Sequence, residues 1–231
     1  MQFIDTHSHL YSSQFDEDRT QVINDAISAG ISTILLPNIS SKYTKGMLEI
    51  CDEFPENCFP MMGLHPCDVN EDNIEGELIH VELELAKGKY IAVGEIGLDL
   101  YWDKTKLEIQ KKAFIHQIEL AKKYKLPIAI HVRDSFAEAI EIIEKLNDES
   151  LSGVFHCFTG RVEDAQRVIN LGGFYLGIGG VLTFKNSALD KTIAAIELQH
   201  LLLVTYSPYL ASLPFRATRK YIKYCVNITQ I

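Results

Sequence analysis

Two apolar runs of strand length decide the fold class, Ile31-Ser-Thr-Ile-Leu-Leu36 and Ile128-Ala-Ile130. Neither run alternates regularly between apolar and polar residues, as a strand with one face in water would. Nearly continuous apolar strands are typical of parallel sheets whose two faces are both covered. The two runs therefore predict an α/β fold in which helices pack around a parallel sheet.

Similar runs recur along the chain. Eight segments predict strands, near Phe3–His7, Ile31–Pro37, Cys58–His65, Tyr90–Leu98, Leu126–Val132, Val154–Phe158, Phe174–Gly179 and Leu201–Thr205. Segments of helical period alternate with them, around Arg19–Ala29, Tyr43–Phe54, Glu77–Lys87, Leu107–Lys125, Ala137–Leu146, Val162–Leu171, Leu189–Glu197 and after Arg216. This pattern predicts one domain over residues 1–231, a (β/α)8 TIM barrel rather than an open doubly wound sheet.

Charge limits the kind of partner. The 231 residues carry 22 Lys+Arg against 31 Asp+Glu, a net charge of −9. This balance argues against a protein that wraps nucleic acid with a basic face. Five basic residues could still form a rim around one cleft or a solvated charged surface, namely Arg133, Lys185, Arg216, Arg219 and Lys220.

Cysteine usage and hydropathy indicate the compartment. The five cysteines contain no Cys-x-x-Cys pair and suggest neither a disulfide framework nor a zinc ribbon. We find no signal sequence and no apolar stretch of about 18 residues, the length of a membrane span. We therefore expect a cytoplasmic protein with no membrane partner, and we expect it to be a monomer.

Polar residues gather at the ends of the predicted strands. A TIM barrel places its active site at the carboxyl ends of its strands. Seven residues fall there, five of them histidines: His7, His9, His65, Glu95, His131, His156 and Tyr206. His7 and His9 are two residues apart on extended chain, so both point to one face together with Asp5.

This set of residues predicts a metal site. A lone buried histidine is usually a hydrogen-bonded core residue, but a His-x-His pair joined by further histidines and Glu95 favours a metal centre. Glu95 lies among apolar residues, where cations compensate its charge, and it could bridge two ions. The alternative is a salt bridge to Arg133 on the neighbouring strand. Nitrogen and oxygen ligands without thiolate suit Mg, Mn, Zn or Ni.

Two further motifs are weaker signals. Gly177-Ile-Gly179-Gly180 could bring the backbone close to a phosphate, or could form a tight turn. Tyr101-Trp102 follows Asp99 near the predicted mouth of the barrel. There Trp102 could stack on a base or pack as part of a lid.

Taken in order, the motifs resemble those of the TatD family of metal-dependent deoxyribonucleases, which are amidohydrolase-like TIM barrels. The matching motifs span nearly the whole chain: Asp5-Thr-His7-Ser-His9, Gly63-Leu-His65-Pro66, Gly94-Glu95-Ile-Gly97-Leu-Asp99, Leu126-Pro-Ile-Ala-Ile-His131-Val-Arg133, His156-Cys-Phe-Thr-Gly160, Gly179-Gly180-Val-Leu-Thr-Phe184 and Ser207-Pro-Tyr-Leu210. The resemblance implies one or two divalent ions, Mg or Mn above all. By that similarity His7 and His9 hold the first metal, Glu95 bridges, and His131 and His156 hold the second.

The resemblance also implies an activity. Family members hydrolyse DNA phosphodiesters, typically as 3′–5′ exonucleases linked to DNA repair or DNA degradation. We therefore expect single-stranded DNA or 3′ ends as the partner. His65, Arg133 and the glycines of the seventh strand would position the phosphates.

The chain departs from the family at the end of the eighth predicted strand. Family members carry Glu-Thr-Asp before Ser-Pro, whereas this chain has Val204-Thr-Tyr206. The aspartate that would ligate the first metal and orient the attacking water is absent. A tyrosine with an ordinary pKa near 10 is a poor base at neutral pH, and it lacks the carboxylate charge that helps to hold Mg. Ser212 also stands where a proline is usual, and the segment after Arg216 is shorter than in relatives, so we expect an incomplete last helix.

Three hypotheses follow. The first is a metal-dependent deoxyribonuclease whose activity is reduced because Tyr206 occupies the place of the catalytic aspartate. The second is a catalytically impaired pseudoenzyme that binds DNA or protein. The third is a hydrolase of a small amide or ester on the same scaffold. A lysine at the strand-four position would favour this third class, and that position holds Glu95.

Overall fold

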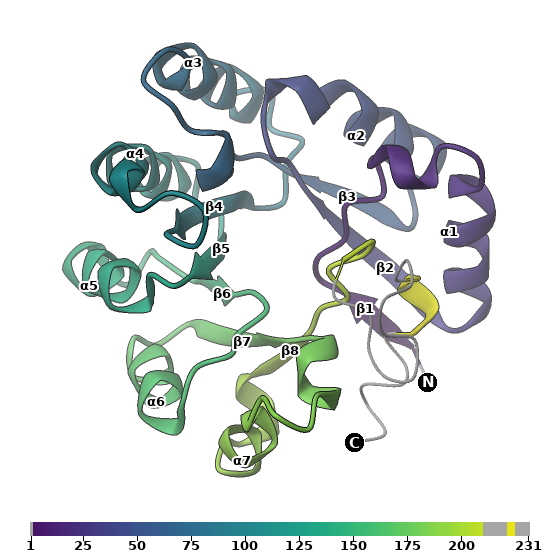
Figure 1. The fold of residues 1–231 in the computed structure, drawn as a ribbon. Coiled ribbons are helices and arrows are strands. Elements are labelled where there is room, and N and C mark those ends of the chain that lie inside the picture. Colours follow the sequence, from purple (N-terminus) through teal and green to yellow (C-terminus); the bar gives the residue numbers. More distant parts are fainter. Residues whose placement is uncertain (1, 210–220, 225–231) are drawn as a thin grey trace.

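The computed structural model describes residues 2–209 and 221–224, in which short strands alternate with helices as the sequence predicts (Figure 1). The strands are β1 (Phe3–Asp5), β2 (Ile31–Pro37), β3 (Cys58–Met61), β4 (Val93–Asp99), β5 (Ile128–Arg133), β6 (Gly153–Phe155), β7 (Phe174–Ile178) and β8 (Leu201–Leu203). The α-helices in these ranges are α1 (Arg19–Ser28), α2 (Ser41–Glu53), α3 (Ile74–Leu85), α4 (Leu107–Tyr124), α5 (Phe136–Leu146), α6 (Val162–Asn170) and α7 (Leu189–Ala194).

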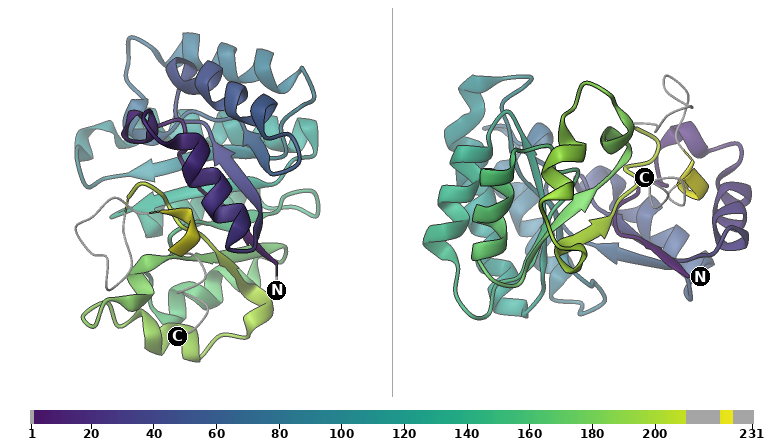
Figure 2. Two further views of the ribbon diagram at one scale, coloured as in Figure 1. Left: turned by 90° about the vertical axis from the view of Figure 1, so that its right-hand side faces the viewer. Right: turned by 90° about the horizontal axis from the view of Figure 1, so that it is seen from below.

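The strands close into a ring. Strands β1 to β3 pair in parallel in chain order, and so do β4 to β8. A bridge between Met62 and Val93 joins the two groups on one side, and a bridge between Ser8 and Ser207 joins them on the other. The result is the predicted (β/α)8 TIM barrel, with the helices arranged around the strands (Figures 1 and 2).

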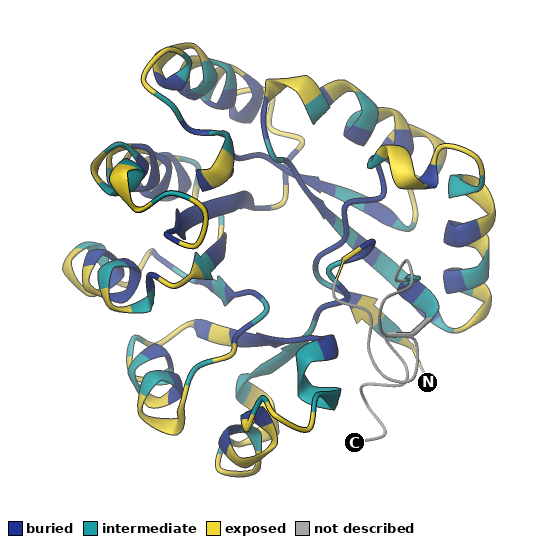
Figure 3. Ribbon diagram, in the orientation of Figure 1, coloured by how far each residue is buried: buried dark blue, intermediate teal, exposed yellow. Residues whose placement is uncertain are grey.

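The core lies between the strands and the helices. Strand β4 is buried along its whole length, while each helix turns one face inward and one outward (Figure 3). In α5 the residues Ala139, Ile140 and Ile143 are fully buried, whereas Glu141 and Glu144 are exposed. This spacing follows the 3.6-residue period of an amphipathic helix.

Several strands end earlier than the sequence predicts. Strand β1 ends at Asp5 and β3 at Met61, so His7, His9 and His65 lie in the loops that follow these strands. The predicted strand-end position of Glu95 is also wrong, because Glu95 lies within β4. Beyond Asp5 the chain keeps single contacts with its neighbours in place of a continuous ladder; the N–H of Ser8, for example, donates to the Leu35 carbonyl across 3.1 Å.

The end of the chain differs in a similar way. Helix α7 ends at Ala194 instead of the predicted Glu197, because hydrogen bonds from Ala195 to Thr192 and from Ile196 to Ile193 tighten its last turn. The predicted helix after Arg216 lies outside the described residues, apart from a 3-10 turn over Ile222–Tyr224. The same is true of Ser212 and of three residues of the predicted basic rim, Arg216, Arg219 and Lys220.

The four described cysteines form no disulfide with one another. They are Cys51, Cys58, Cys67 and Cys157. Within residues 2–209 and 221–224, each helix is too short or too polar to cross a membrane.

One glycine sets the close approach of β4 and β5. Gly97 pairs with His131 and has a φ of 140°. A Cβ atom on Gly97 would lie 2.0 Å from the carbonyl oxygen of His131. No other residue fits this position without backbone movement, and few adopt this φ without strain. The packing of the two strands that carry Glu95 and His131 therefore depends on Gly97.

We expect Gly97→Ala to lower the free energy of unfolding by at least about 2 kcal/mol, because it adds a backbone clash to an unfavourable φ. Urea unfolding followed by circular dichroism measures this change. Gly76→Ala in α3 is the matched control, since nothing lies within 4 Å of its Cβ position. The control should keep or raise stability by up to about 1 kcal/mol. Equal stabilities of the two variants would contradict the role of Gly97.

Candidate metal centre

A fully buried carboxylate, Glu95, lies inside the barrel among five buried histidines. Each histidine has a ring nitrogen between 2.6 and 3.4 Å from a Glu95 oxygen. The five are His7, His9, His65, His131 and His156. The structure thus brings together all the histidines that the sequence places at strand ends.

The two oxygens of Glu95 divide these histidines into two groups. Oε2 lies 3.0 Å from Nε2 of His7 and 3.3 Å from Nε2 of His9. Oε1 lies 2.6 Å from Nε2 of His156, 2.9 Å from Nδ1 of His131 and 3.4 Å from Nε2 of His65. One carboxylate therefore faces two clusters of nitrogen donors, as a ligand that bridges two ions does.

The spacing within each group fits the ligand shell of an ion. Nε2 of His7 and Nε2 of His9 are 3.3 Å apart, and so are Nε2 of His156 and Nδ1 of His131. Ligands of a tetrahedral ion at its usual bond length are separated by about 3.4 Å. Two sets of residues can each hold an ion, His7 with His9 and Glu95, and His65 with Glu95 and His131. The donor set of these residues therefore fits one or two divalent ions.

Tyr11 fixes the proton position on His9. The Tyr11 hydroxyl donates to the carbonyl of Pro37 across 2.5 Å and lies 2.7 Å from Nδ1 of His9. Because its own proton goes to Pro37, the hydroxyl must accept the Nδ1 proton of His9. In the neutral imidazole this contact makes Nε2 of His9 the nitrogen with the lone pair, and Nε2 faces the Glu95 group as a metal ligand does. The sequence analysis did not find this contact, although Tyr11 follows His9 by two residues.

Asp99 orients His131, another contact that the sequence analysis missed. Oδ2 of Asp99 lies 2.9 Å from Nε2 of His131, whose Nδ1 faces Glu95. Burial alone would lower the pKa of His131, but the hydrogen bonds to Asp99 and Glu95 raise this pKa to about 9. The signal was present in the sequence, since Glu95 and Asp99 are four residues apart in one strand and so share a face.

Burial controls the charge of the other histidines. It lowers the pKa of His7 well below its ordinary value, and the nearby His156 lowers it further. Burial likewise lowers the pKa values of His65 and His156. These rings are therefore neutral at pH 7, the form that binds metal. Burial alone would raise the pKa of Glu95, but the surrounding histidines outweigh it and hold this pKa well below its usual range.

Asp5 anchors the segment after β8. Its carboxylate accepts hydrogen bonds from the Thr205 N–H across 2.8 Å and from the Thr205 hydroxyl across 2.5 Å. The N–H of Tyr206 in turn donates to the His7 carbonyl across 2.9 Å. These bonds hold Tyr206 beside the His7 and His9 group.

Tyr206 packs against the histidines where the resemblance implies a carboxylate. Its ring centroid lies 5.5 Å from that of His7, 5.6 Å from His9 and 5.3 Å from His156. Burial and the charge of Glu95 raise the pKa of Tyr206 far above its ordinary value, so it is a neutral phenol. Val204 is fully buried. The segment therefore contributes ring contacts to the site in place of negative charge.

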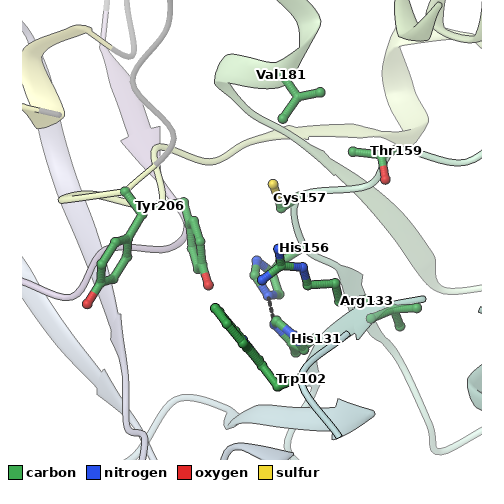
Figure 4. A pocket seen from close by; sticks show the side chains of 10 residues that line it. Trp102, His131, Arg133, His156, Cys157, Thr159, Val181 and Tyr206 are labelled. Carbon is green, nitrogen blue, oxygen red and sulfur yellow. Dashed lines mark hydrogen bonds between the residues drawn. The ribbon is translucent and has the colours of Figure 1, made fainter. Parts of the chain in front are cut away.

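A cavity of about 540 Å³ adjoins the histidines (Figure 4). Trp102, Arg133 and Tyr206 line it together with His131 and His156. Arg133 stacks on the ring of Tyr101, with its Cζ 3.5 Å from the ring centroid. The alternative salt bridge between Glu95 and Arg133 is therefore wrong, since both Glu95 oxygens face histidines.

Close packing against neighbouring residues explains the glycines in β7 and just after it. A Cβ atom on Gly177 would lie 2.9 Å from Cα of His156, and one on Gly179 would lie 3.1 Å from Cγ2 of Val204. These close approaches explain both glycines without a phosphate. Lys185, a further residue of the predicted basic rim, is exposed.

The comparisons with known proteins agree with this geometry. The sequence profile of the family described as TatD related DNase matches residues 4–231. The chain belongs to the TatD family. It is 36% identical over 224 residues to the uncharacterized metal-dependent hydrolase YabD of Bacillus subtilis (strain 168), covering 95% of this chain and 87% of YabD.

Two more members of the TatD family bear on activity and fold. The 3′-5′ ssDNA/RNA exonuclease TatD of Rahnella sp. (strain Y9602) is 32% identical over 204 residues, covering 87% of this chain and 77% of that protein. The crystal structure of YJJV, a TatD homologue of Escherichia coli K12, superposes with a TM-score of 0.91 at 28% identity. That match covers 99% of this chain and 88% of YJJV. The chain is thus a metal-dependent hydrolase of the TatD family.

We expect His131→Ala to weaken the binding of Mn²⁺ at least about tenfold, because the variant loses a nitrogen donor beside Glu95. Isothermal titration calorimetry of the metal-free protein measures the affinity. His116→Ala, an exposed histidine of α4, is the matched control and should leave the affinity unchanged. An unchanged affinity in His131→Ala would exclude this residue from the metal centre.

Proposed function

We propose that the protein is a metal-dependent 3′–5′ exonuclease of single-stranded DNA with reduced activity. The observation that carries this proposal is the division of five histidines between the two oxygens of Glu95. Sites with two adjacent ions suit in-line displacement at phosphodiesters. The family relation supports the same reaction class, since the TatD proteins include one named for ssDNA and RNA exonuclease activity.

Each residue has a proposed role in the metal centre. His7 and His9 would hold the first ion, His131 and His156 would hold the second, and Glu95 would contribute an oxygen to each. A bound divalent ion supplies the Lewis acid that activates water and neutralises charge on the phosphate. The chain itself keeps three of these donors in ligand form, His9 through its contact with Tyr11, and His7 and His156 through burial.

Two further residues act on the substrate. The Arg133 guanidinium lines the cavity next to His131, where it can bind a phosphate by charge-assisted hydrogen bonds. His65 lies 3.4 Å from Oε1 of Glu95, so it is placed either to position the phosphate or to complete the second ion's ligands. Tyr206 is the neutral group that stands at the position of the family aspartate.

Reduced turnover follows from Tyr206. A neutral phenol neither takes a proton from water at pH 7 nor adds negative charge to the first metal site. The alternative, a catalytically impaired protein that binds DNA or protein, rests on the same observation, because the Tyr206 ring packs against His7 and His156. Action in the cytoplasm, a link to DNA repair and a monomeric state stay predictions.

We expect the protein to release nucleotides slowly from single-stranded DNA with Mg²⁺ or Mn²⁺, and Tyr206→Asp to raise kcat at least about tenfold, since it restores a carboxylate. A gel assay of 3′-labelled and 5′-labelled oligonucleotides measures the rate and the direction of cleavage.

Two controls belong to this assay. His131→Ala should abolish release, because the second group loses a donor, whereas His116→Ala should leave the rate unchanged. If only Tyr206→Asp is active, the natural chain is a catalytically impaired protein that binds DNA or protein. If neither is active while both bind Mn²⁺, the exonuclease proposal is wrong.

A further inference from the structure

Trp102 stands exposed at the mouth of the barrel. It is the one tryptophan of the sequence, and 71% of its surface is accessible to solvent. Large aromatic side chains are usually well covered in folded proteins. Trp102 nevertheless lines the cavity that contains His131 and His156 (Figure 4). Its open face is therefore available to a ligand at the metal centre.

Arg133 and Tyr101 hold this surface in place. Cζ of Arg133 lies 3.5 Å from the ring centroid of Tyr101 and 5.5 Å from that of Trp102. The two rings meet edge to face, with centroids 4.9 Å apart. Within the described ranges the guanidinium pairs with rings and with no carboxylate, so its hydrogen-bond donors stay available. We call Tyr101, Trp102 and Arg133 the aromatic wall.

The aromatic wall is attached directly to the metal centre. The N–H of Tyr101 donates to Oδ1 of Asp99 across 3.0 Å, while Oδ2 of Asp99 faces Nε2 of His131. The N–H of Leu100 donates to the Arg133 carbonyl across 2.9 Å, which continues the pairing of β4 with β5. A ligand on Trp102 is thereby held at a fixed position relative to His131.

We propose that the aromatic wall is a subsite for one unpaired nucleotide, with the base stacked on Trp102 and a phosphate bound by Arg133. This inference rests on the proposed function and identifies the residues that select a single-stranded substrate. The cavity of about 540 Å³ is within the usual range for small ligands. A planar base and an anionic phosphate match the exposed ring and the guanidinium beside it.

The wall selects for single strands. In a duplex both faces of each internal base are already stacked and its edge is paired, so a base must leave the stack to reach Trp102. Stacking accepts every base, because each has a π face. The protein's net charge of −9 repels a nucleic acid at a distance, so attraction has to come from contacts inside this cavity. DNA and RNA strands share the recognised chemistry.

The lone tryptophan provides a readout that does not depend on cleavage. Trp102 fluorescence is titrated in Mg²⁺ with phosphorothioate oligothymidylate, with the matching RNA strand, with the same DNA in a duplex, and with a base-free sugar-phosphate strand of equal length. We expect both single strands to quench the fluorescence and to bind at least about fivefold more tightly than the base-free strand and the duplex.

Variants separate stacking from a structural role. Trp102→Ala should raise KM for single-stranded DNA at least about fivefold with little change in kcat, and should bind the base-bearing and base-free strands equally by fluorescence anisotropy. Trp102→Phe should restore most of the difference between these strands. Tyr175→Ala is the matched control, since Tyr175 is an exposed aromatic residue near the start of β7.

The outcomes distinguish this proposal from the proposed function. Base-dependent quenching without any release of nucleotides would leave the subsite standing and refute the exonuclease. Release of nucleotides with equal affinity for base-bearing and base-free strands would refute the subsite and leave the exonuclease standing. Equal binding of duplex and single strands also overturns the subsite. The DNA and RNA arms show which strand is the better ligand.

Discussion

The burial of a single carboxylate is the constraint on which the rest of this structure depends. An ionised Glu95 inside the barrel would be very costly alone, so the chain surrounds it with five histidines from four loops and strands. The irregular register of β4 at Gly94 and the close approach at Gly97 bring β4 and β5 into the positions that this cluster requires. The barrel mouth is thereby built around one charge.

The groups around the cluster decide what it can do. Tyr11 leaves Nε2 of His9 as a lone pair, and Asp99 holds His131 from behind. Such contacts fix the orientation of metal ligands, and their loss typically weakens metal binding about 10- to 100-fold. Asp99 also accepts a hydrogen bond from the N–H of Tyr101, so it connects the aromatic wall to His131. Tyr206 packs a neutral ring against His7, so this side chain adds no negative charge to the cluster.

The sequence analysis predicted the barrel and the histidine cluster because both depend on local patterns. Apolar runs such as Ile31–Pro37 mark strands, and polar residues at their ends must converge in a barrel. It misplaced Glu95 at a strand end, because the shift in register between β4 and β5 arises from pairing of distant residues. From the sequence, either metal ions or Arg133 could compensate the charge of Glu95. The structure excluded Arg133, because both Glu95 oxygens face histidines and Arg133 stacks on Tyr101.

By itself, the sequence determined the fold class, the family resemblance and the residue types of the metal centre. Strand patterns and ligand types can be recognised from residues that are close together in the chain. The tertiary structure decided which Glu95 oxygen faces which histidine, which proton His9 carries and where Trp102 lies. These features depend on distances between side chains far apart in the chain. Such distances are fixed only when the strands have closed into a ring and their loops have packed over its mouth.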